Sequence, residues 1–338
     1  GIIVKECKKL NLRGGEMATL MDVAKRANVS KMTVSRVINH PEQVTDELKE
    51  LVYAAMKELD YHPNLIAKAL VSNSTRIIKL CILEDIDVTE PYYMNLMVGI
   101  AKALDLHQYS LQLVTRRNFD IGNCDGYIIT GLRESDVAWI RDLTKPVVVF
   151  GENQYGFDYV DTNNQLGTYL AAQLALERGY RQLIYIGMAS EEAFEKSREA
   201  GYLQLMHEQQ RPVQLHHFNN HSHLTEAYII EHWAQFKLET AFICATDRLA
   251  IGIERGIASC GGHVPQEFGI TGFDGVFLNQ VASPKLTTIK QSIIEMGRAC
   301  GENILKKINQ EWIERPLIFE PHIEMGGTIR PVLKEQSE

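Results

Sequence analysis

The sequence lacks the long apolar runs that are typical of membrane proteins. It also lacks the cysteine patterns that are typical of secreted domains with disulfides and of metal-binding domains. None of its 338 residues lies in an apolar run near the roughly 18 residues that a membrane span needs. The apolar stretch Ile2-Ile3-Val4 is too short for the core of a signal peptide. The 6 cysteines are scattered without metal or redox spacing, which predicts free thiols, most of them buried. We therefore expect a cytoplasmic protein without a membrane partner.

Signatures of catalysis and of nucleotide binding are also missing. The sequence contains no G-x-G-x-x-G, no G-K-[ST], no G-x-S-x-G and no H-E-x-x-H pattern. The run Cys260-Gly261-Gly262-His263 places a thiol near an imidazole, but no third group accompanies them, and the glycines indicate the end of a helix. These absences argue against an enzyme and give no reason to expect a cofactor.

Four histidines lie close together in the sequence, at His216, His217, His221 and His223. They share no helical register that would gather them on one face, as a metal site on a helix requires. We therefore expect an exposed loop there and no metal site.

The distribution of charge says more than the net charge of −8, which by itself disfavours a nucleic-acid binder. Residues 17–41 carry an excess of three positive charges, residues 42–62 an excess of four negative charges, and residues 63–79 three cations without an acid. Binding to phosphates depends on the cations that face the nucleic acid. Two basic segments around an acidic one are compatible with DNA binding, and charge alone leaves the question open.

The segment that follows Met17 has the pattern of two short helices joined by a tight turn. Thr19 with Asp22 three residues later predicts a capping box that opens the first helix. Asn28 tolerates the left-handed conformation that a tight turn needs, and Ser30 is suited to cap the second helix. Side chains suited to base edges and phosphates remain on the outside of that helix: Lys31, Met32, Thr33, Ser35 and Arg36. The pattern predicts a helix-turn-helix, the alternative being a helical hairpin with a solvated face.

A third helix is predicted from Thr45 to about Leu59, with Asp46 and Glu47 in its first turn. Its apolar stripe would close a small three-helix core. Its acidic outer face accounts for the negative segment.

These motifs closely resemble the head of lactose-repressor (LacI/GalR) family regulators. The resemblance is carried by residues 19–24, 29–39, 59–64 and 67–70, and it extends over nearly the whole chain from Met17. It implies that Lys31 and Met32 select the operator sequence, while other residues make more general DNA contacts. The DNA-binding set that it implies is Thr19, Ser30, Lys31, Met32, Thr33, Ser35, Arg36, Asn39, Asn64, Ala67, Lys68 and Leu70.

Residues 63–75 are predicted to form a hinge. After Pro63 only about two helical turns can form, and so short a helix is marginal in water unless something covers it. The resemblance implies that two such hinges pair in the minor groove, where Leu70 wedges between base steps. The alternative is a plain interdomain linker.

The body, residues 76–332, alternates apolar runs with amphipathic stretches. Strand-like runs occur at Ile77–Leu83, Ser110–Val114, Gly126–Thr130, Val147–Phe150, Leu183–Ile186, Ala241–Cys244 and Gly269–Phe273. Such alternation predicts parallel sheets with crossover helices. The expected fold is thus an all-α helix-turn-helix head on an α/β body whose two parallel-sheet lobes, by the resemblance, form a periplasmic-binding-protein-like architecture.

Ligands of open α/β sheets bind outside the carboxyl ends of the strands, where several polar and aromatic residues occur in this sequence. Two questions stay open there: Tyr92 and Tyr93 could stack on a sugar or belong to the core, and Asp247 could merely cap a helix. The resemblance adds Arg198 and Gln291, whose groups suit polyol hydroxyls. The candidate effector-binding set is Tyr92, Tyr93, Asp161, Arg198, Thr246, Asp247, Asp274 and Gln291.

The expected organisation is a leader at 1–16, a DNA-binding head at 17–62, a hinge at 63–75 and an effector-binding and dimerisation body at 76–332. The leader falls outside the resemblance, and we expect it to be disordered. Residues 115–125 leave too little room for the helix usual in the family. No leucine heptad follows Arg330, so a homodimer is expected rather than a tail-built tetramer.

The resulting hypothesis is a repressor of carbohydrate-use genes with three partners: a palindromic double-stranded operator, a second copy of the chain, and a sugar or sugar-phosphate effector. The alternative is a sugar-binding sensor whose head binds protein rather than DNA. The sequence does not identify the effector or say whether it releases the protein from DNA.

Overall fold

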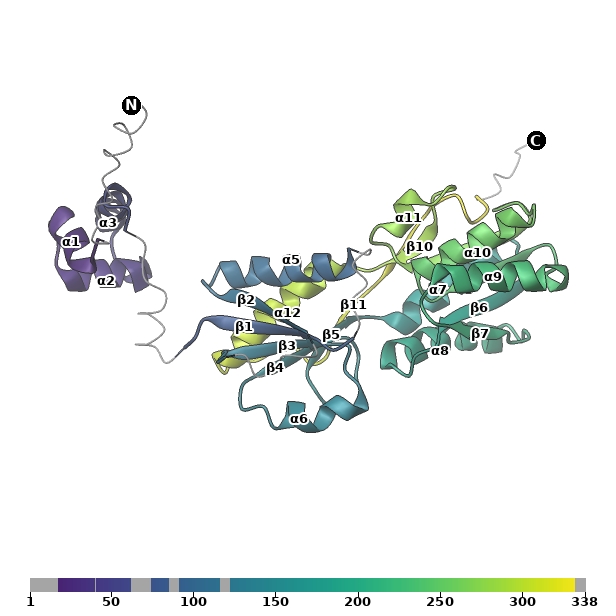
Figure 1. The fold of residues 1–338 in the computed structure, drawn as a ribbon, viewed down its shortest axis with the longest axis horizontal. Helices are drawn as coiled ribbons and strands as arrows, with labels where there is room; N and C mark the ends of the chain where they lie inside the picture. Colours follow the sequence, from purple (N-terminus) through teal and green to yellow (C-terminus); the bar gives the residue numbers. More distant parts are fainter. Residues whose placement is uncertain (1–17, 40, 62–73, 85–90, 116–121, 332–338) are drawn as a thin grey trace, which may run out of the picture. The chain divides into compact units, whose positions relative to one another are not determined.

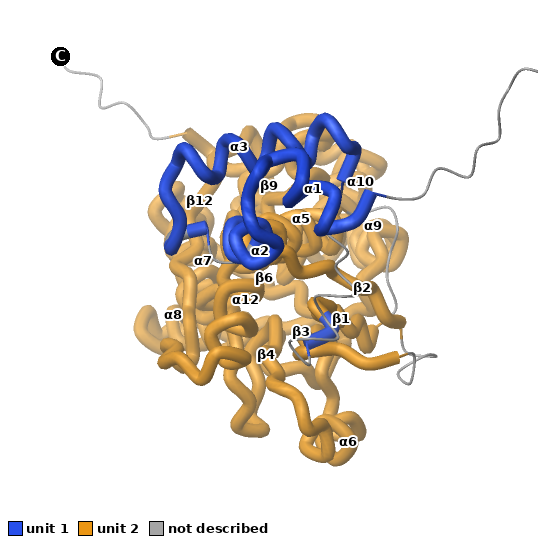
Figure 2. Tube along the Cα trace, turned by 90° about the vertical axis from the view of Figure 1, so that its left-hand side faces the viewer, with its two compact units in different colours: residues 1–75 blue, residues 76–338 orange. Residues whose placement is uncertain are grey.

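The computed structural model describes residues 18–39, 41–61, 74–84, 91–115 and 122–331. The chain divides into two compact units, residues 1–75 and residues 76–338 (Figure 2). The expected leader lies outside the described residues, as do four of the DNA-binding candidates: Asn64, Ala67, Lys68 and Leu70. Among the described residues, no helix has the length and apolar character needed to cross a membrane.

The described part of the first unit forms three α-helices around a small apolar core. Its elements are α1 (Leu20–Arg26), α2 (Lys31–Asn39), the short 3-10 helix η1 (Pro41–Gln43) and α3 (Asp46–Glu58). The capping box is present: the Thr19 hydroxyl accepts from the Asp22 N–H at 3.3 Å, and the Thr19 N–H donates to the Asp22 carboxylate at 2.9 Å. Asn28 makes the turn at a φ of 54°. The side chains that fill the core are Val23, Ala24, Ala27, Val34, Val37, Val52 and Ala55.

The second unit contains two six-stranded sheets, each with helices on its faces (Figure 1). The first lobe has the strand order β11-β5-β4-β3-β1-β2, and every pair in it is parallel. Its strands are β1 (Ile77–Ile82), β2 (Ser110–Thr115), β3 (Gly126–Thr130), β4 (Val147–Phe150), β5 (Tyr159–Thr162) and β11 (Leu317–Phe319). Its helices are α5 (Tyr92–Asp105), η2 (Glu134–Asp136), α6 (Val137–Arg141) and α12 (Ile293–Ile308).

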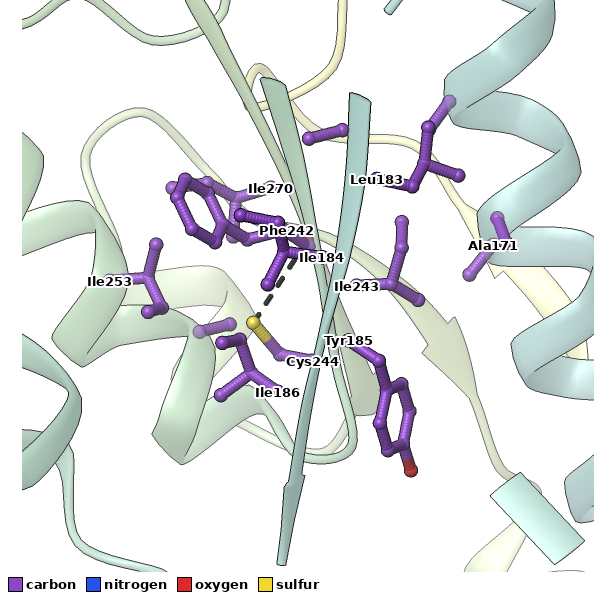
Figure 3. Close-up of a cluster of buried hydrophobic side chains, with 14 of the residues drawn as sticks. Ala171, Leu183, Ile184, Tyr185, Ile186, Phe242, Ile243, Cys244, Ile253 and Ile270 are labelled. Atoms are coloured by element: carbon purple, nitrogen blue, oxygen red, sulfur yellow. Dashed lines mark hydrogen bonds between the residues drawn. The ribbon is translucent and has the colours of Figure 1, made fainter. Parts of the chain in front are cut away.

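The second lobe has the order β12-β10-β9-β8-β6-β7, with β12 antiparallel to its neighbour. Its strands are β6 (Gln182–Met188), β7 (Leu215–Phe218), β8 (Thr240–Cys244), β9 (Phe268–Asp274), β10 (Thr287–Lys290) and β12 (His322–Glu324). Its helices are α7 (Asn164–Glu177), α8 (Ala193–Glu208), α9 (Ser222–His232), η3 (Trp233–Gln235), α10 (Asp247–Ser259) and α11 (Leu278–Val281). Apolar residues of β6 and β8, such as Ile184 and Phe242, form its core together with Ile253 of α10 (Figure 3). The architecture confirms the fold predicted from the sequence.

The chain passes between the two lobes three times. It crosses from β5 to α7, returns from β10 to α12, and crosses again from β11 to β12. As a result α12, near the end of the chain, packs on α5 and on the strands of the first lobe (Figure 1). Each lobe therefore depends on a late segment of the sequence.

The lobes differ at one equivalent connection. In the second lobe, α9 follows β7 before the chain enters β8. In the first lobe, the described residues between β2 and β3, 122–125, form no helix. Lys79 of β1 is buried nearby and donates from Nζ to the Gly122 carbonyl at 2.7 Å, so a polar contact lies on this face of the sheet.

Glycines set the spacing of the helix pairs that cover the sheets. A Cβ on Gly99 of α5 would collide with the Ile294 carbonyl of α12. Gly201 of α8 has the same relation to the Gln165 carbonyl of α7. These backbones approach so closely that only glycine fits.

Replacing Gly99 by alanine is expected to lower the free energy of unfolding by about 2 kcal/mol, because the two helices must separate. The sign of this change distinguishes a crowded position from an open one. In an uncrowded helix interior, alanine raises the free energy of unfolding by about 1 kcal/mol relative to glycine. Urea unfolding of the two proteins measures the difference. A more stable variant would show that the helices are not in contact at this position.

Candidate functional site

A cavity of about 180 Å³ lies between the lobes, where the carboxyl ends of strands from both sheets meet. We call it the inner chamber. Of the predicted effector-binding residues, six line it: Tyr92, Tyr93, Asp161, Arg198, Thr246 and Asp274. Asp247 and Gln291 do not line it, although Gln291 contacts Asp274 at its wall. A second chamber of about 900 Å³, the outer chamber, adjoins it.

Arg198 of α8 is held at the base of the inner chamber and is 4% exposed. Its Nε donates to Asn164 Oδ1 at 2.9 Å and its Nη1 to the Ala245 carbonyl at 2.6 Å. The guanidinium also stacks on the Phe273 ring at 3.6 Å from the centroid. These contacts fix the plane of the guanidinium before any ligand arrives, which reduces the entropic cost of binding.

Asp274 faces Arg198 from the end of β9, with Oδ1 at 3.7 Å from Nη1. Its backbone has a φ of 115°, a conformation that L-residues rarely adopt. Gln291 donates from Nε2 to the Asp274 carboxylate at 2.8 Å, and its N–H donates to the Asp274 carbonyl at 3.1 Å. In this structure Gln291 thus orients Asp274. Its predicted contact with the effector stays a prediction.

Asp161 is the second buried carboxylate of the chamber, at 5% exposed. It accepts from the N–H of Glu152 at 2.7 Å and from Asn164 Nδ2 at 3.0 Å. Burial raises the pKa of Asp161 to about 6, against the lowering effect of hydrogen bonds from the Glu152 and Thr162 N–H groups and of the Arg198 charge. Asn164 therefore links Asp161 of the first lobe to Arg198 of the second.

The sequence left open whether Asp247 caps a helix, and in the structure it does not. Thr246 occupies the N-cap position of α10, and its hydroxyl accepts from the Leu249 N–H at 3.2 Å. Asp247 is 2% exposed; it accepts from the Gly275 N–H at 2.9 Å and from the Thr288 hydroxyl. It therefore joins the ends of β9 and β10 beside the chamber.

The two tyrosines at the start of α5 both line the chamber and pack on the core of the first lobe. Their rings meet edge to face at 5.4 Å, and Tyr92 meets Phe150 in the same manner at 6.1 Å. The core role that the sequence left open is thus confirmed, and stacking on a sugar stays a prediction. Phe194 adds an aromatic ring from the second lobe.

Sequence reasoning missed several polar residues of the chamber: Glu84, Glu152, Glu192 and Asn220. Glu152 and Glu84 each stand two residues after a strand, β4 and β1 respectively, so the strand-end rule could have found both. The Glu152 carboxylate accepts from the Ser197 hydroxyl at 2.8 Å, a hydrogen bond that joins the two lobes across the cleft. Glu192 precedes α8 in the second lobe, and no local pattern marks it.

Glu195, one turn before Arg198, is a buried acid behind the chamber. It is 2% exposed, and its Oε1 accepts from the Tyr185 hydroxyl at 2.8 Å. Its Oε2 has no hydrogen-bond partner in the described part of the chain. Burial raises the pKa of Glu195 from 4.5 to about 7.

The Glu195→Gln variant is expected to be about 2 kcal/mol more stable than the wild type at pH 8 and nearly equal to it at pH 5. The native state keeps the Glu195 proton up to about pH 7, whereas the unfolded chain releases it near 4.5. The free energy of unfolding of the wild type therefore falls as the pH rises through this window. The variant shows no such fall, because its amide group does not titrate. Thermal unfolding at both pH values measures it, with the exposed Glu231→Gln as control. An equal difference at both pH values would contradict the assignment.

The structure corrects the expectation for the histidines. His216 and His217 do not lie in an exposed loop but in β7, where His217 contacts Glu199 through Nε2 at 2.7 Å. His221 precedes α9 and His223 lies within it. No group of three or more potential metal ligands occurs among the described residues.

The surface of α2 presents the side chains predicted to read DNA. Lys31 and Arg36 are exposed, and Met32 is 70% exposed although it is apolar. Ser30 caps the helix, its hydroxyl accepting from the Thr33 N–H at 3.0 Å. Of Asn39, only the backbone is described. Met32 lies between the cations Lys31 and Arg36 in the sequence of α2. An apolar side chain beside two cations suits a groove that offers both methyl groups and phosphates.

Comparison with known proteins supports both units. Residues 19–64 match the family of bacterial regulatory proteins of the lacI type, and residues 172–328 match the periplasmic binding protein-like domain. An uncharacterized HTH-type transcriptional regulator of Bacillus subtilis, YvdE, is 49% identical over 91% of this chain and 98% of its own length.

Solved structures share the fold. A lac repressor dimer bound to operator and the anti-inducer ONPF is 21% identical, with a TM-score of 0.74 over 92% of this chain and 98% of its own. The transcriptional regulator CelR in complex with cellobiose is 24% identical, with a TM-score of 0.67 over 92% of this chain and 99% of its own.

The matching relatives are regulators, which confirms the expectation that the protein is not an enzyme. The chain belongs to the LacI family of bacterial regulatory proteins and is a DNA-binding transcriptional regulator.

Proposed function

We propose that the protein is a repressor of carbohydrate-use genes whose effector is a saccharide bound in the inner chamber. The observation that carries this proposal is the fixed trio of Arg198, Asp274 and Asp161 beside aromatic rings. Guanidinium and carboxylate groups suit the paired donors and acceptors of adjacent hydroxyls, while aromatic rings suit the apolar faces of a sugar. The cellobiose complex of the CelR neighbour supports this class of ligand.

The head is proposed to read a palindromic operator through α2, with residues 17–62 as the DNA-binding domain and 63–75 as the hinge. The predicted hinge contacts Asn64, Ala67, Lys68 and Leu70 remain part of this proposal. The body would form the homodimer that aligns two half-sites. Exposed apolar side chains of the first lobe, Met94, Val98 and Leu113, supply a surface for it.

The effector would act by favouring one relative orientation of the lobes. The hydrogen bond between Glu152 and Ser197 and the link through Asn164 are contacts that change when the cleft opens. A saccharide that touches both lobes binds the closed cleft better, and this differential affinity is what shifts the equilibrium of the hinge pair.

The test is enrichment of random DNA duplexes by the full-length protein, with and without saccharides, followed by sequencing. The expected result is a palindrome that Lys57→Ala enriches in full and that Arg36→Ala recovers in about tenfold lower yield. Lys57 is the control because it is an equal charge on α3. Release of that palindrome by a saccharide would support the effector. Enrichment of nothing under all conditions would overturn the DNA-reading proposal and leave a sensor whose head binds protein.

A further inference from the structure

The inner and outer chambers form one continuous cleft. They share four lining residues: Leu132, Glu152, Glu192 and Ala193. The inner chamber, at about 180 Å³, is smaller than the roughly 300–1,000 Å³ usual for sites that enclose a drug-sized molecule. It suits a single sugar ring, and its shared lining places the larger outer chamber directly beside it.

The charges of the inner chamber disfavour an anionic ligand. Only Arg198 is positive among the lining residues, against five carboxylates: Glu84, Glu152, Asp161, Glu192 and Asp274. Burial raises the pKa of Asp161 to about 6 and that of Glu192 to about 7, so both carry their charge in mildly alkaline solution. A phosphate monoester brings nearly two negative charges and would meet this field inside a partly dry cavity.

The outer chamber is polar and contains one aromatic ring, that of Tyr155. The loop that carries Tyr155 is fixed by its backbone. Its N–H donates to Asn153 Oδ1 at 3.1 Å, and its carbonyl accepts from Arg141 Nη2 at 3.2 Å. Asn153 Oδ1 also accepts from the Phe157 N–H at 3.3 Å, so the turn is closed on both sides of Tyr155. A ring on so constrained a loop can serve as a platform for an apolar sugar face at little entropic cost.

We propose that the cleft takes an uncharged oligosaccharide of two or more rings, with one ring in the inner chamber and the next against Tyr155 in the outer chamber. This rests on the proposed saccharide effector and narrows it to neutral, extended sugars. Side chains of the outer chamber with hydroxyl or amide groups, Ser135, Gln154 and Ser190, offer partners for the second ring. A phosphate group in the inner chamber is disfavoured by the carboxylates around Arg198.

Calorimetric titration of the full-length protein at pH 8 tests the proposal. The probes are glucose, galactose, maltose, cellobiose, lactose, maltotriose and glucose 6-phosphate. We expect at least one disaccharide to bind about tenfold more tightly than its component monosaccharides, and glucose 6-phosphate to bind more weakly than glucose. The Tyr155→Ala variant should lose about tenfold for that disaccharide and nothing for the monosaccharide, whereas Tyr155→Phe should retain the affinity.

One control variant accompanies these measurements. Tyr53→Ala, which removes an exposed ring from α3 of the head, should leave every affinity unchanged. Equal affinity for one ring and two, an equal loss of both in Tyr155→Ala, or tighter binding of glucose 6-phosphate than of glucose would each overturn the inference and leave the saccharide effector standing. Binding of no saccharide at all would overturn the proposed effector and the inference with it.

Discussion

Replacing Arg198 by alanine is expected to weaken saccharide binding by at least about a hundredfold while operator DNA is still bound. The guanidinium is buried, its plane is fixed by Asn164 and the Ala245 carbonyl, and it faces Asp274. Hydrogen bonds from a charged, preorganised donor are roughly twice as strong as neutral ones. DNA binding should persist because the head is a separate compact unit. Calorimetry with the sugar and a shift assay with the operator measure the two effects.

The same change should lower the free energy of unfolding of the body by about 3 kcal/mol, because Asp274 and the Ala245 carbonyl lose their partner inside the protein. Arg198→Lys keeps the charge but cannot reproduce the planar fork, so an intermediate loss is expected. Arg181→Ala is the matched control, since that side chain is 83% exposed and pairs with Glu239 at the surface. Full saccharide response in Arg198→Ala would remove this residue from the effector site.

Replacing Arg36 by alanine is expected to weaken binding to operator and to unrelated DNA alike, by about tenfold at moderate salt. A cation that contacts only phosphate adds affinity without sequence preference. The slope of the logarithm of the binding constant against the logarithm of salt concentration should become less steep by about one unit. Fluorescence anisotropy at several salt concentrations measures both quantities.

Met32→Ala should behave differently, because the exposed thioether carries no charge. We expect an unchanged salt slope and a loss of discrimination at a single base pair, of about 1 kcal/mol. If Met32→Ala changed the slope and Arg36→Ala changed the preferred base, the two roles would be reversed. Lys57→Ala again reports the effect of losing a charge elsewhere on the head.

The sequence predicted those features that depend on short-range patterns. The capping box at Thr19 and the turn at Asn28 are local, and the longer strands carry enough apolar residues to stand out. The strands that were not predicted are short or have an interrupted apolar pattern. β11 and β12 have three residues each, and in β7 two histidines interrupt the apolar alternation.

The candidate site was predictable only as far as strand ends could be located. That rule found Asp161 and Asp274, which stand at or next to the ends of β5 and β9. It could not pair Glu84 with Glu192, because residues 108 positions apart meet only once both lobes are assembled. It left open whether Asp247 caps a helix, because its partners Gly275 and Thr288 are distant in sequence.

The three passages between the lobes have a consequence for biosynthesis. A ribosome completes α1 to α3 within the first fifth of translation, and this head has its own core. The first lobe lacks α12 and β11 until residue 319 has been added, and the second lacks β12 until residue 324. A nascent or prematurely terminated chain would therefore carry a folded head on an unfinished body, one that cannot align two heads on an operator.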